Sequence, residues 1–289
     1  MTNWTIGILV SVLVGGILLL GGLLSLAWGF LAARLVAQVV GDEFMFAADT
    51  GTYTVGGRAI HIKEVKREGL LYLLGALAVF AYALSNESWS LAWAVGLLAA
   101  LGCARISTQM VPATILVLGQ SETDTLELQA RLNHDLGPFR AISLLQTRRG
   151  EDPVLLKGNC FRVGPGDDWV EAVEALCKLL PLVVLDVRGS SQNVDEEIEI
   201  VRREQYFFKT IFVTRAGGRD HIVRRTGEVG DAGPAAPVVC VTDNASCSRL
   251  VFRLLKQARL APTRQRPLGE LVTYDPAAEE WCLRDPRGW

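Results

Sequence analysis

The chain has 289 residues and a mass of 31.5 kDa; half of its residues are hydrophobic, 21% are charged, and the formal net charge is −2. This composition excludes an intrinsically disordered chain, a collagen-like chain and a low-complexity chain. The balance of 29 basic and 31 acidic residues gives no overall positive field, so we expect no nucleic acid as a partner.

The N-terminal residues are apolar enough to cross a membrane. Residues 1–33 carry no charged side chain, and Trp4 and Trp28 lie near the two ends of the apolar run 6–31. About 20 apolar residues span the hydrocarbon core, and tryptophan favours the membrane interface. The run is too long for a signal peptide, and no Lys or Arg precedes it. We therefore predict a transmembrane helix and its extension at residues 1–40.

A short polar insert and a second apolar block follow. Residues 41–68 are predicted to form a small cytosolic β-hairpin insert that turns at Gly56 and Gly57. Residues 69–104 are apolar except near a polar break at 85–90, which favours a transmembrane hairpin of two short helices over residues 69–107. A single interfacial or re-entrant element is the alternative, so two and three spans both remain open.

The basic residues near the apolar segments predict the orientation. With three spans, Arg34, Lys63, Lys66, Arg67 and Arg105 all lie on one side of the membrane. The positive-inside rule makes this side cytoplasmic and leaves the N-terminus outside. We therefore expect a multi-pass protein of the inner (cytoplasmic) membrane, with the lipid bilayer as a partner. The spans lack the ionisable residues that an ion path needs, which argues against a transporter subunit.

Residues 108–262 alternate apolar runs with amphipathic segments, which predicts a cytosolic domain. The expected strands are at 114–119, 141–146, 160–163, 182–187, 207–214 and 237–242. The expected helices are at 126–136, 167–180, 194–204 and 246–260. This order predicts the α/β class, with a three-layer, doubly wound, mainly parallel sheet of flavodoxin-like or Rossmann-like type. Residues 263–289 are expected to form a C-terminal hairpin or tail.

Several kinds of active site are absent from the sequence. The six cysteines form no CxxC pair and the three histidines are far apart, so we expect no metal site. There is no Walker A loop, no GxGxxG and no GxSxG, which argues against a P-loop enzyme and a serine hydrolase. These motifs therefore assign no cofactor to the chain.

Polar residues stand where the predicted strands end. Ligands of open parallel sheets bind beyond the carboxyl ends of the strands. The candidate ligand-binding residues at these ends are Gln120, Ser121, Asp186, Arg188, Gly189 and Ser190. They suit a nucleotide or phosphate, although solvated loops have a similar composition. Both interpretations stay open.

Glu196 and Glu197 lie near the start of the predicted helix at 194–204. Ile198 and Val201, three residues apart, are expected to face the sheet, so a neighbouring glutamate can lean into the strand-end cleft. There it can act as a base or stabilise a developing cation. The alternative is a simple interaction between the acid and the helix dipole.

Two stretches resemble a known family. FRVGPGDDWVEAV (161–173) and LVVLDVRGSS (182–191), followed by Glu196, Glu197 and Ile198, resemble bacterial membrane-anchored TIR-like domains. The resemblance covers residues 114–260 and is strongest over 160–200. Glu196 stands where those domains usually carry an aromatic residue.

The TIR-like resemblance implies a bacterial signalling or defence module that acts by self-association or by recruiting a protein partner. Some TIR domains cleave NAD with a glutamate of this helix. The resemblance therefore also implies the alternative of an NAD hydrolase or nucleotide sensor, with NAD or another nucleotide as ligand or substrate. Glu197 is then the catalytic residue, and Trp169 of the Asp-Asp-Trp motif is a ligand-binding residue.

Overall fold

The computed structural model describes residues 3–41, 44–45, 53–55, 58–60, 68–119, 122–146, 159–163, 167–189, 192–215, 222, 238–256, 271–275 and 280–283. The chain divides into two compact units. Unit 1 comprises Met1–Leu35 and Lys63–Pro112, and unit 2 comprises Val36–Ile62 and Ala113–Trp289.

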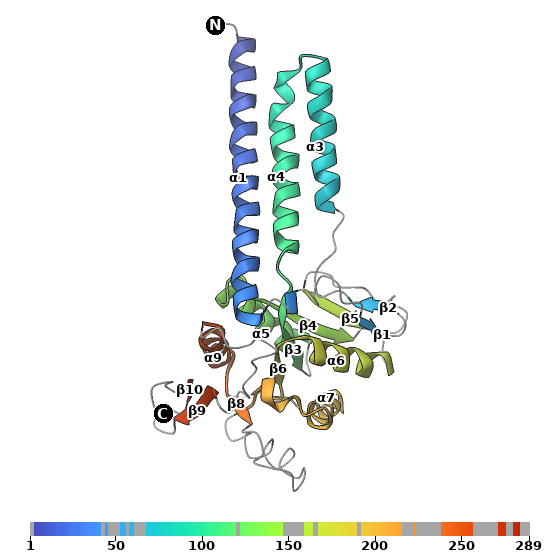
Figure 1. Cartoon of the computed structure of the whole chain (residues 1–289), viewed down its shortest axis with the longest axis vertical. Helices are drawn as coiled ribbons and strands as arrows, with labels where there is room; N and C mark the ends of the chain where they lie inside the picture. Colours follow the sequence, from blue (N-terminus) through green and yellow to red (C-terminus); the bar gives the residue numbers. More distant parts are fainter. Residues whose placement is uncertain are drawn as a thin grey trace. The chain divides into compact units, whose positions relative to one another are not determined.

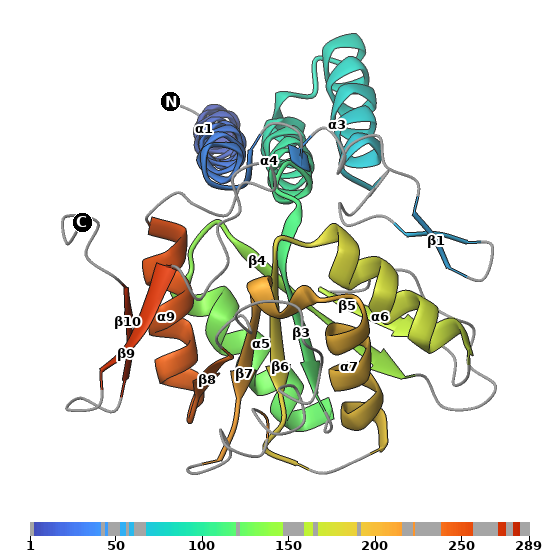
Figure 2. The same ribbon diagram turned by 60° about the horizontal axis from the view of Figure 1, so that its bottom comes forward.

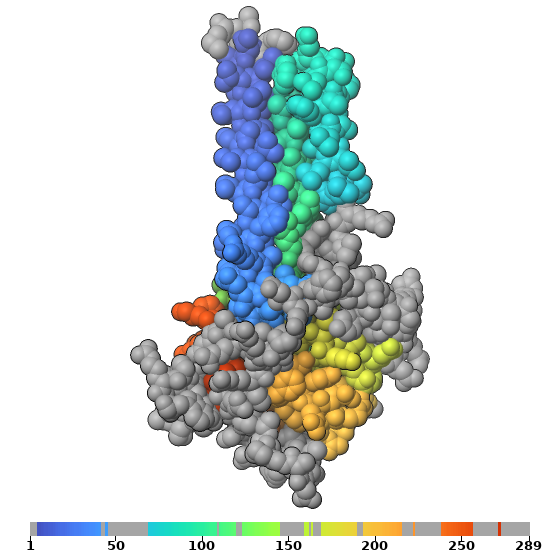
Figure 3. Space-filling view, in the orientation of Figure 1, coloured from blue at the N-terminus to red at the C-terminus, as the bar shows by residue number. Residues whose placement is uncertain are grey.

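Unit 1 consists of apolar helices. Most of α1 (Asn3–Val40), together with α3 (Glu68–Ser85) and α4 (Ala92–Gln109), lies side by side in a bundle (Figures 1 and 3). A 3-10 turn, η1 (Trp89–Leu91), leads into α4, so α3 and α4 form a helical hairpin. The apolar block therefore contains two helices with a polar break between them.

Glycines bring the helices of unit 1 close together. A Cβ atom added to Gly22 of α1 would lie only 2.6 Å from the Cα atom of Ala100 in α4. Seven residues later in both helices, about two turns, Gly29 packs against Ser107, whose hydroxyl donates a hydrogen bond of 2.7 Å to the carbonyl of Ser25. The contacts advance in the same direction along both helices, so α1 and α4 are parallel. Close approach through small residues is typical of helices that pack in membranes.

The outer surface of this bundle is apolar. Leu13, Leu24 and Leu77 are each 60% or more exposed. Among the described residues, every exposed large hydrophobic side chain except Phe252 lies in α1, α3, η1 or α4. Two helical segments are long and apolar enough to cross a membrane: Thr5–Val40, with a mean hydropathy of 2.6, and Trp89–Thr108, with 1.5. The shorter Gly69–Ser85 is also apolar.

Unit 2 contains a sheet of six parallel strands. The strands are β3 (Ala113–Gly119), β4 (Arg140–Gln146), β5 (Cys160–Val163), β6 (Leu182–Asp186), β7 (Thr210–Val213) and β8 (Val239–Val241). Their spatial order is β5-β4-β3-β6-β7-β8, and all neighbouring pairs are parallel. This is the Rossmann order 3-2-1-4-5-6, and without the short edge strand β5 it is the flavodoxin-like order 2-1-3-4-5.

Helices cover both faces of the sheet, as Figure 2 shows. On one face α5 (Glu122–Asp135) packs against α9 (Asn244–Lys256), and on the other α6 (Asp167–Leu179) packs against α7 (Gln192–Arg203). Both covered faces select apolar residues, so β3 and β6 are apolar along almost their whole length, and all of their residues except Gly119 are buried. The predicted α/β class with a parallel sheet is confirmed.

Unit 2 also contains a 3-10 turn and two short hairpins. The strand expected at 207–214 begins only at Thr210, because Tyr206–Lys209 forms a 3-10 turn, η2. Two antiparallel hairpins lie outside the main sheet. One pairs β1 (Tyr53–Val55) with β2 (Arg58–Ile60), and the other pairs β9 (Val272–Asp275) with β10 (Glu280–Leu283).

Candidate functional site

The candidate site lies where the sheet reverses its strand order. From β3 the chain moves to β4 on one side, whereas from β6 it moves to β7 on the other side. β3 and β6 are neighbours, and their last residues, Gly119 and Asp186, are paired in register. Ligands of doubly wound sheets bind in the crevice that such a reversal leaves at the carboxyl ends of the strands. We call the residues around Gly119 and Asp186 the switch point.

Asp186 is buried and paired at the switch point. It is 4% exposed, and its carboxylate accepts hydrogen bonds from the backbone N–H of Arg188 at 3.1 Å and from Nε of the same residue at 2.9 Å. A third bond comes from Nη2 of Arg188 at 2.5 Å. Hydrogen bonding to Asp186 raises the pKa of the Arg188 guanidinium, against the opposing effect of burial. This short loop therefore folds its arginine back over the strand end.

Glu197 is a buried acid beside this ion pair. The stripe of α7 that faces the sheet contains Val194, Ile198 and Val201, all 4% exposed or less, and the period of 3.6 residues puts Glu197 on the same side. Its side chain is 3% exposed, and its Oε2 has no hydrogen-bond partner among the described residues.

The protonation of Glu197 follows from this environment. Burial first, and then the nearby charge of Asp186, raise its pKa to about 8. The carboxyl group is therefore mostly protonated at neutral pH. An approaching cation would favour its ionised form, so the group can bind or release a proton when a ligand enters.

Thr125 of α5 is a second buried polar group at the switch point. Its side chain is 1% exposed, and its Oγ1 has no hydrogen-bond partner in the described part of the chain. A Cβ atom added to Gly119 would lie 3.0 Å from this oxygen and 2.9 Å from Cβ of Asp186. Glycine is therefore required for the close approach of β3, β6 and α5. The sequence signal for Thr125 is its helical spacing from the buried Leu128 and Leu132.

The start of α9 closes another side of the switch point. Asp243 caps this helix, since its Oδ1 accepts hydrogen bonds of 2.8 Å from the backbone N–H groups of Ala245 and Ser246. Cys247 is fully buried, and burial followed by the charge of Asp186 raises the pKa of its thiol to about 12. The Cys247 thiol is thus unreactive at neutral pH.

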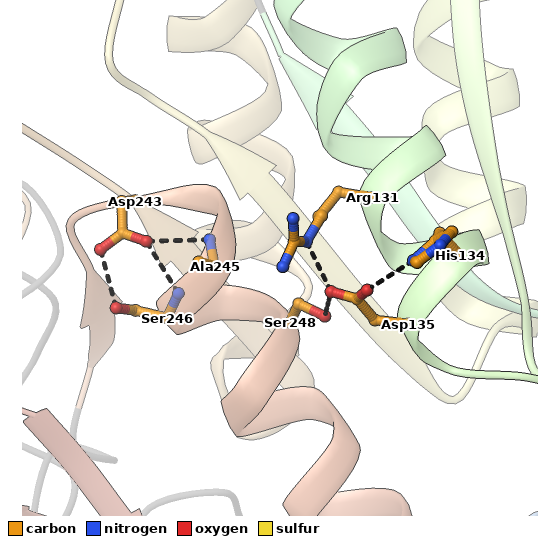
Figure 4. A network of polar contacts seen from close by, with 7 residues as sticks. All are labelled: Arg131, His134, Asp135, Asp243, Ala245, Ser246 and Ser248. Carbon is orange, nitrogen blue, oxygen red and sulfur yellow. Dashed lines mark hydrogen bonds and ion pairs between the residues drawn. The ribbon is translucent and has the colours of Figure 1, made fainter.

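A Ser–Asp–His cluster links α5 to α9 but is not a catalytic triad. Asp135 accepts hydrogen bonds from the Ser248 hydroxyl at 2.7 Å and from Arg131 Nε at 2.6 Å, and His134 Nδ1 lies 2.8 Å from its Oδ1 (Figure 4). The hydroxyl therefore meets the carboxylate instead of the imidazole, and Ser248 is buried. These hydrogen bonds, led by that from His134, lower the pKa of Asp135 to about 2. The cluster ties two helices together.

Lys209 is also buried, but its ammonium group has hydrogen-bond acceptors. Its Nζ donates hydrogen bonds to the carbonyls of Leu180 at 3.0 Å and Lys178 at 3.4 Å, and it lies 4.7 Å from the centre of the Tyr206 ring. Burial lowers the pKa of Lys209 to about 8. Lys209 caps the C-terminus of α6 beside the amino end of β7, whereas the switch point lies at the carboxyl ends of the strands. The burial of Lys209 is therefore explained by a structural role.

The structure brings together some of the residues predicted from sequence. Asp186, Arg188, Gly189 and Glu197 belong to β6, the loop that follows it and α7, and Asp186 and Glu197 interact electrostatically. Trp169 lies elsewhere: it is 4% exposed in the first turn of α6, which follows the far edge strand β5.

Three further predicted residues, Gln120, Ser121 and Ser190, lie outside the described residues. The described residues contain no group of three or more His, Cys, Asp and Glu side chains that could hold a metal ion.

Comparison with known proteins adds no relative. No family model matches the chain, and neither a curated protein nor a solved structure matches it.

Proposed function

We propose that this protein is anchored in a bacterial inner membrane and that its α/β domain binds a nucleotide, such as NAD, at the switch point. One observation carries the proposal: Glu197 is buried without a hydrogen-bond partner for Oε2 among the described residues, beside the ion pair of Asp186 and Arg188. Leaving a buried carboxyl unsatisfied costs about 1–3 kcal/mol. Such a cost is typical of residues that are kept for binding or catalysis.

The bundle of unit 1 supports the membrane anchor. Its large apolar side chains face outward, which in water would expose a patch far larger than soluble proteins tolerate. The 18 residues of α3 give a length of about 27 Å, close to the hydrocarbon thickness of ~30 Å. With α1, α3 and α4 each crossing once, Arg34 and Arg105 lie on the cytoplasmic side with the α/β domain.

The chemistry that we propose for the switch point is cleavage of the nicotinamide–ribose bond of NAD. The nitrogen of nicotinamide keeps the electron pair and leaves, and water adds to the ribose carbon with loss of a proton. Ionised Glu197 would stabilise the positive charge that develops on the ribose. Because its pKa is about 8 in the free protein, we expect kcat/KM to rise with pH up to about 8.

The test is NAD turnover by the full-length protein in lipid nanodiscs. Glu197→Gln keeps the shape of the side chain and removes its charge, so we expect turnover to fall by at least about 100-fold. Glu196→Gln makes the same change one residue earlier and serves as the matched control. Turnover that is equal in the two variants would contradict the role of Glu197.

A second candidate is a TIR-like signalling or defence module that acts by self-association or partner recruitment without turnover. The observation that favours it is the closure of the switch point: Asp186 and Glu197 are only 3–4% exposed, and Arg188 covers the strand end. Under this proposal the nanodisc preparation cleaves no NAD. Chemical crosslinking of the full chain in native membranes should then yield oligomers that Glu197→Gln leaves unchanged.

A further inference from the structure

Helix α9 carries a basic and aromatic face on its exposed side. Its buried side consists of Cys247, Ser248, Leu250, Val251, Leu254 and Leu255. The opposite side carries Arg249, Phe252, Arg253 and Lys256, which lie within an arc of about 100° at 100° per residue. We call these four residues the α9 face.

Phe252 is unusual within unit 2. It is 48% exposed, and no other large apolar side chain described in this unit is exposed. A single exposed phenylalanine is unremarkable by itself, but Phe252 has basic residues at positions −3, +1 and +4 of the same helix. An aromatic ring among long basic side chains is the composition of helices that lie at a lipid interface.

The net charge of residues 244–269, which include α9, differs from that of the whole chain. The whole sequence is nearly neutral, with a net charge of −2, yet no acidic residue occurs from 244 to 269. Beyond α9 the sequence carries three more arginines before Glu270, at Arg259, Arg264 and Arg266. The positive charge is therefore concentrated locally, and an anionic surface is its electrostatic complement.

We infer that the α9 face docks on the anionic lipid headgroups of the membrane in which the protein is anchored. This inference rests on the membrane anchor proposed above and is independent of the nucleotide site. The α4 helix ends at Gln109 and β3 begins at Ala113, so a short tether keeps the domain at a high effective concentration near the bilayer. Arg249, Arg253 and Lys256 then contact headgroups, and the Phe252 ring enters the interface.

The experiment measures hydrogen–deuterium exchange of the full chain in two kinds of nanodisc. One kind contains phosphatidylcholine only, and the other contains phosphatidylcholine with phosphatidylglycerol. We expect the amides of α9 to exchange at least about tenfold more slowly in the anionic nanodiscs, and the protection to disappear at high salt. Equal exchange in the two lipids, with the chain inserted, would overturn the inference.

Variants identify the responsible side chains. Arg253→Glu with Lys256→Glu should abolish the protection, and Phe252→Ser should reduce it while leaving the charge intact. The matched control is Lys178→Glu with Arg215→Glu, which reverses two exposed charges outside α9 and should leave the protection unchanged. Protection lost equally in the control pair would overturn the assignment to the α9 face.

Two other outcomes are distinguishable. A chain that fails to enter nanodiscs would overturn the membrane anchor and this inference together. A chain that inserts, exchanges equally in both lipids and gains α9 protection only on addition of RNA would overturn the lipid inference alone. Neither outcome depends on whether the switch point cleaves NAD.

Discussion

The sharpest test of the switch point is the stability of Glu197→Gln as a function of pH. The unfolded chain releases the Glu197 proton near the ordinary pKa of 4.5, and the folded chain releases it near 8. Between these values the folded state binds one more proton than the unfolded state, so stability falls as the pH rises. The stabilising contribution of protonation is complete below pH 4.5 and is lost by the time the pH has passed 8.

The size of the effect follows from the pKa difference. Each pH unit changes the free energy of unfolding by about 1.4 kcal/mol, so the loss between pH 4.5 and pH 7 is about 3 kcal/mol. Glutamine cannot ionise, so Glu197→Gln should gain this amount relative to the wild type over the same interval. For a domain of this size, the melting temperature of the variant should rise by about 6–12 °C relative to the wild type.

The assay is thermal unfolding of the full chain in detergent, followed by tryptophan fluorescence between pH 5 and pH 8. Trp169 is buried in unit 2, so unfolding of the α/β domain changes its contribution to the total emission of the seven tryptophans. Glu196→Gln is the control for a change of charge on the same helix. A difference between Glu197→Gln and the wild type that stays constant from pH 5 to pH 8 would refute the conclusion that burial keeps this carboxyl protonated.

Three further changes test other parts of the structure. Arg188→Ala leaves the buried carboxylate of Asp186 without its guanidinium and should lower the free energy of unfolding at pH 7 by about 2–3 kcal/mol in urea titrations, somewhat less than for a fully buried pair. Gly22→Leu should separate α1 from α4 and lower the melting temperature in detergent, whereas Gly21→Leu, which meets nothing within 4 Å, should not. Phe212→Ala in the fully buried core should destabilise unit 2 by about 3–5 kcal/mol in the same urea assay.

The strands and the buried face of α7 could be predicted from sequence because their signals are local. Each strand is a short apolar run, and both covered faces of a parallel sheet select the same kind of residue. The spacing of Ile198 and Val201 also identified the side of α7 that faces the sheet, and both residues are buried there. The sequence left open whether Glu196 or Glu197 leans toward the strand ends or only interacts with the helix dipole; in the structure Glu197 is buried near Asp186.

Other features depend on contacts between residues that are distant in sequence. The edge position of β5 follows from pairing with β4 alone, which no local pattern reveals. The turn at Tyr206–Lys209 exists where Lys209 reaches the carbonyls at the end of α6, about 30 residues earlier in the chain. From the sequence, Thr125 is an ordinary helical threonine. Its position beside the strand ends depends on the pairing of β3 with β6, which the sequence of α5 does not reveal.

The distribution of unsatisfied polar atoms argues for ligand binding at the switch point. Within the described residues, Thr125 and Glu197 are the two side chains less than 5% exposed that keep a buried oxygen without a hydrogen-bond partner. The buried charges of Asp186 and Lys209 have partners at ordinary hydrogen-bond distances. A fold selected only for stability would replace both exceptions by apolar residues, since buried polar groups without partners are costly. Their location on opposite sides of the β3–β6 strand ends supports the proposal that a ligand binds at the switch point.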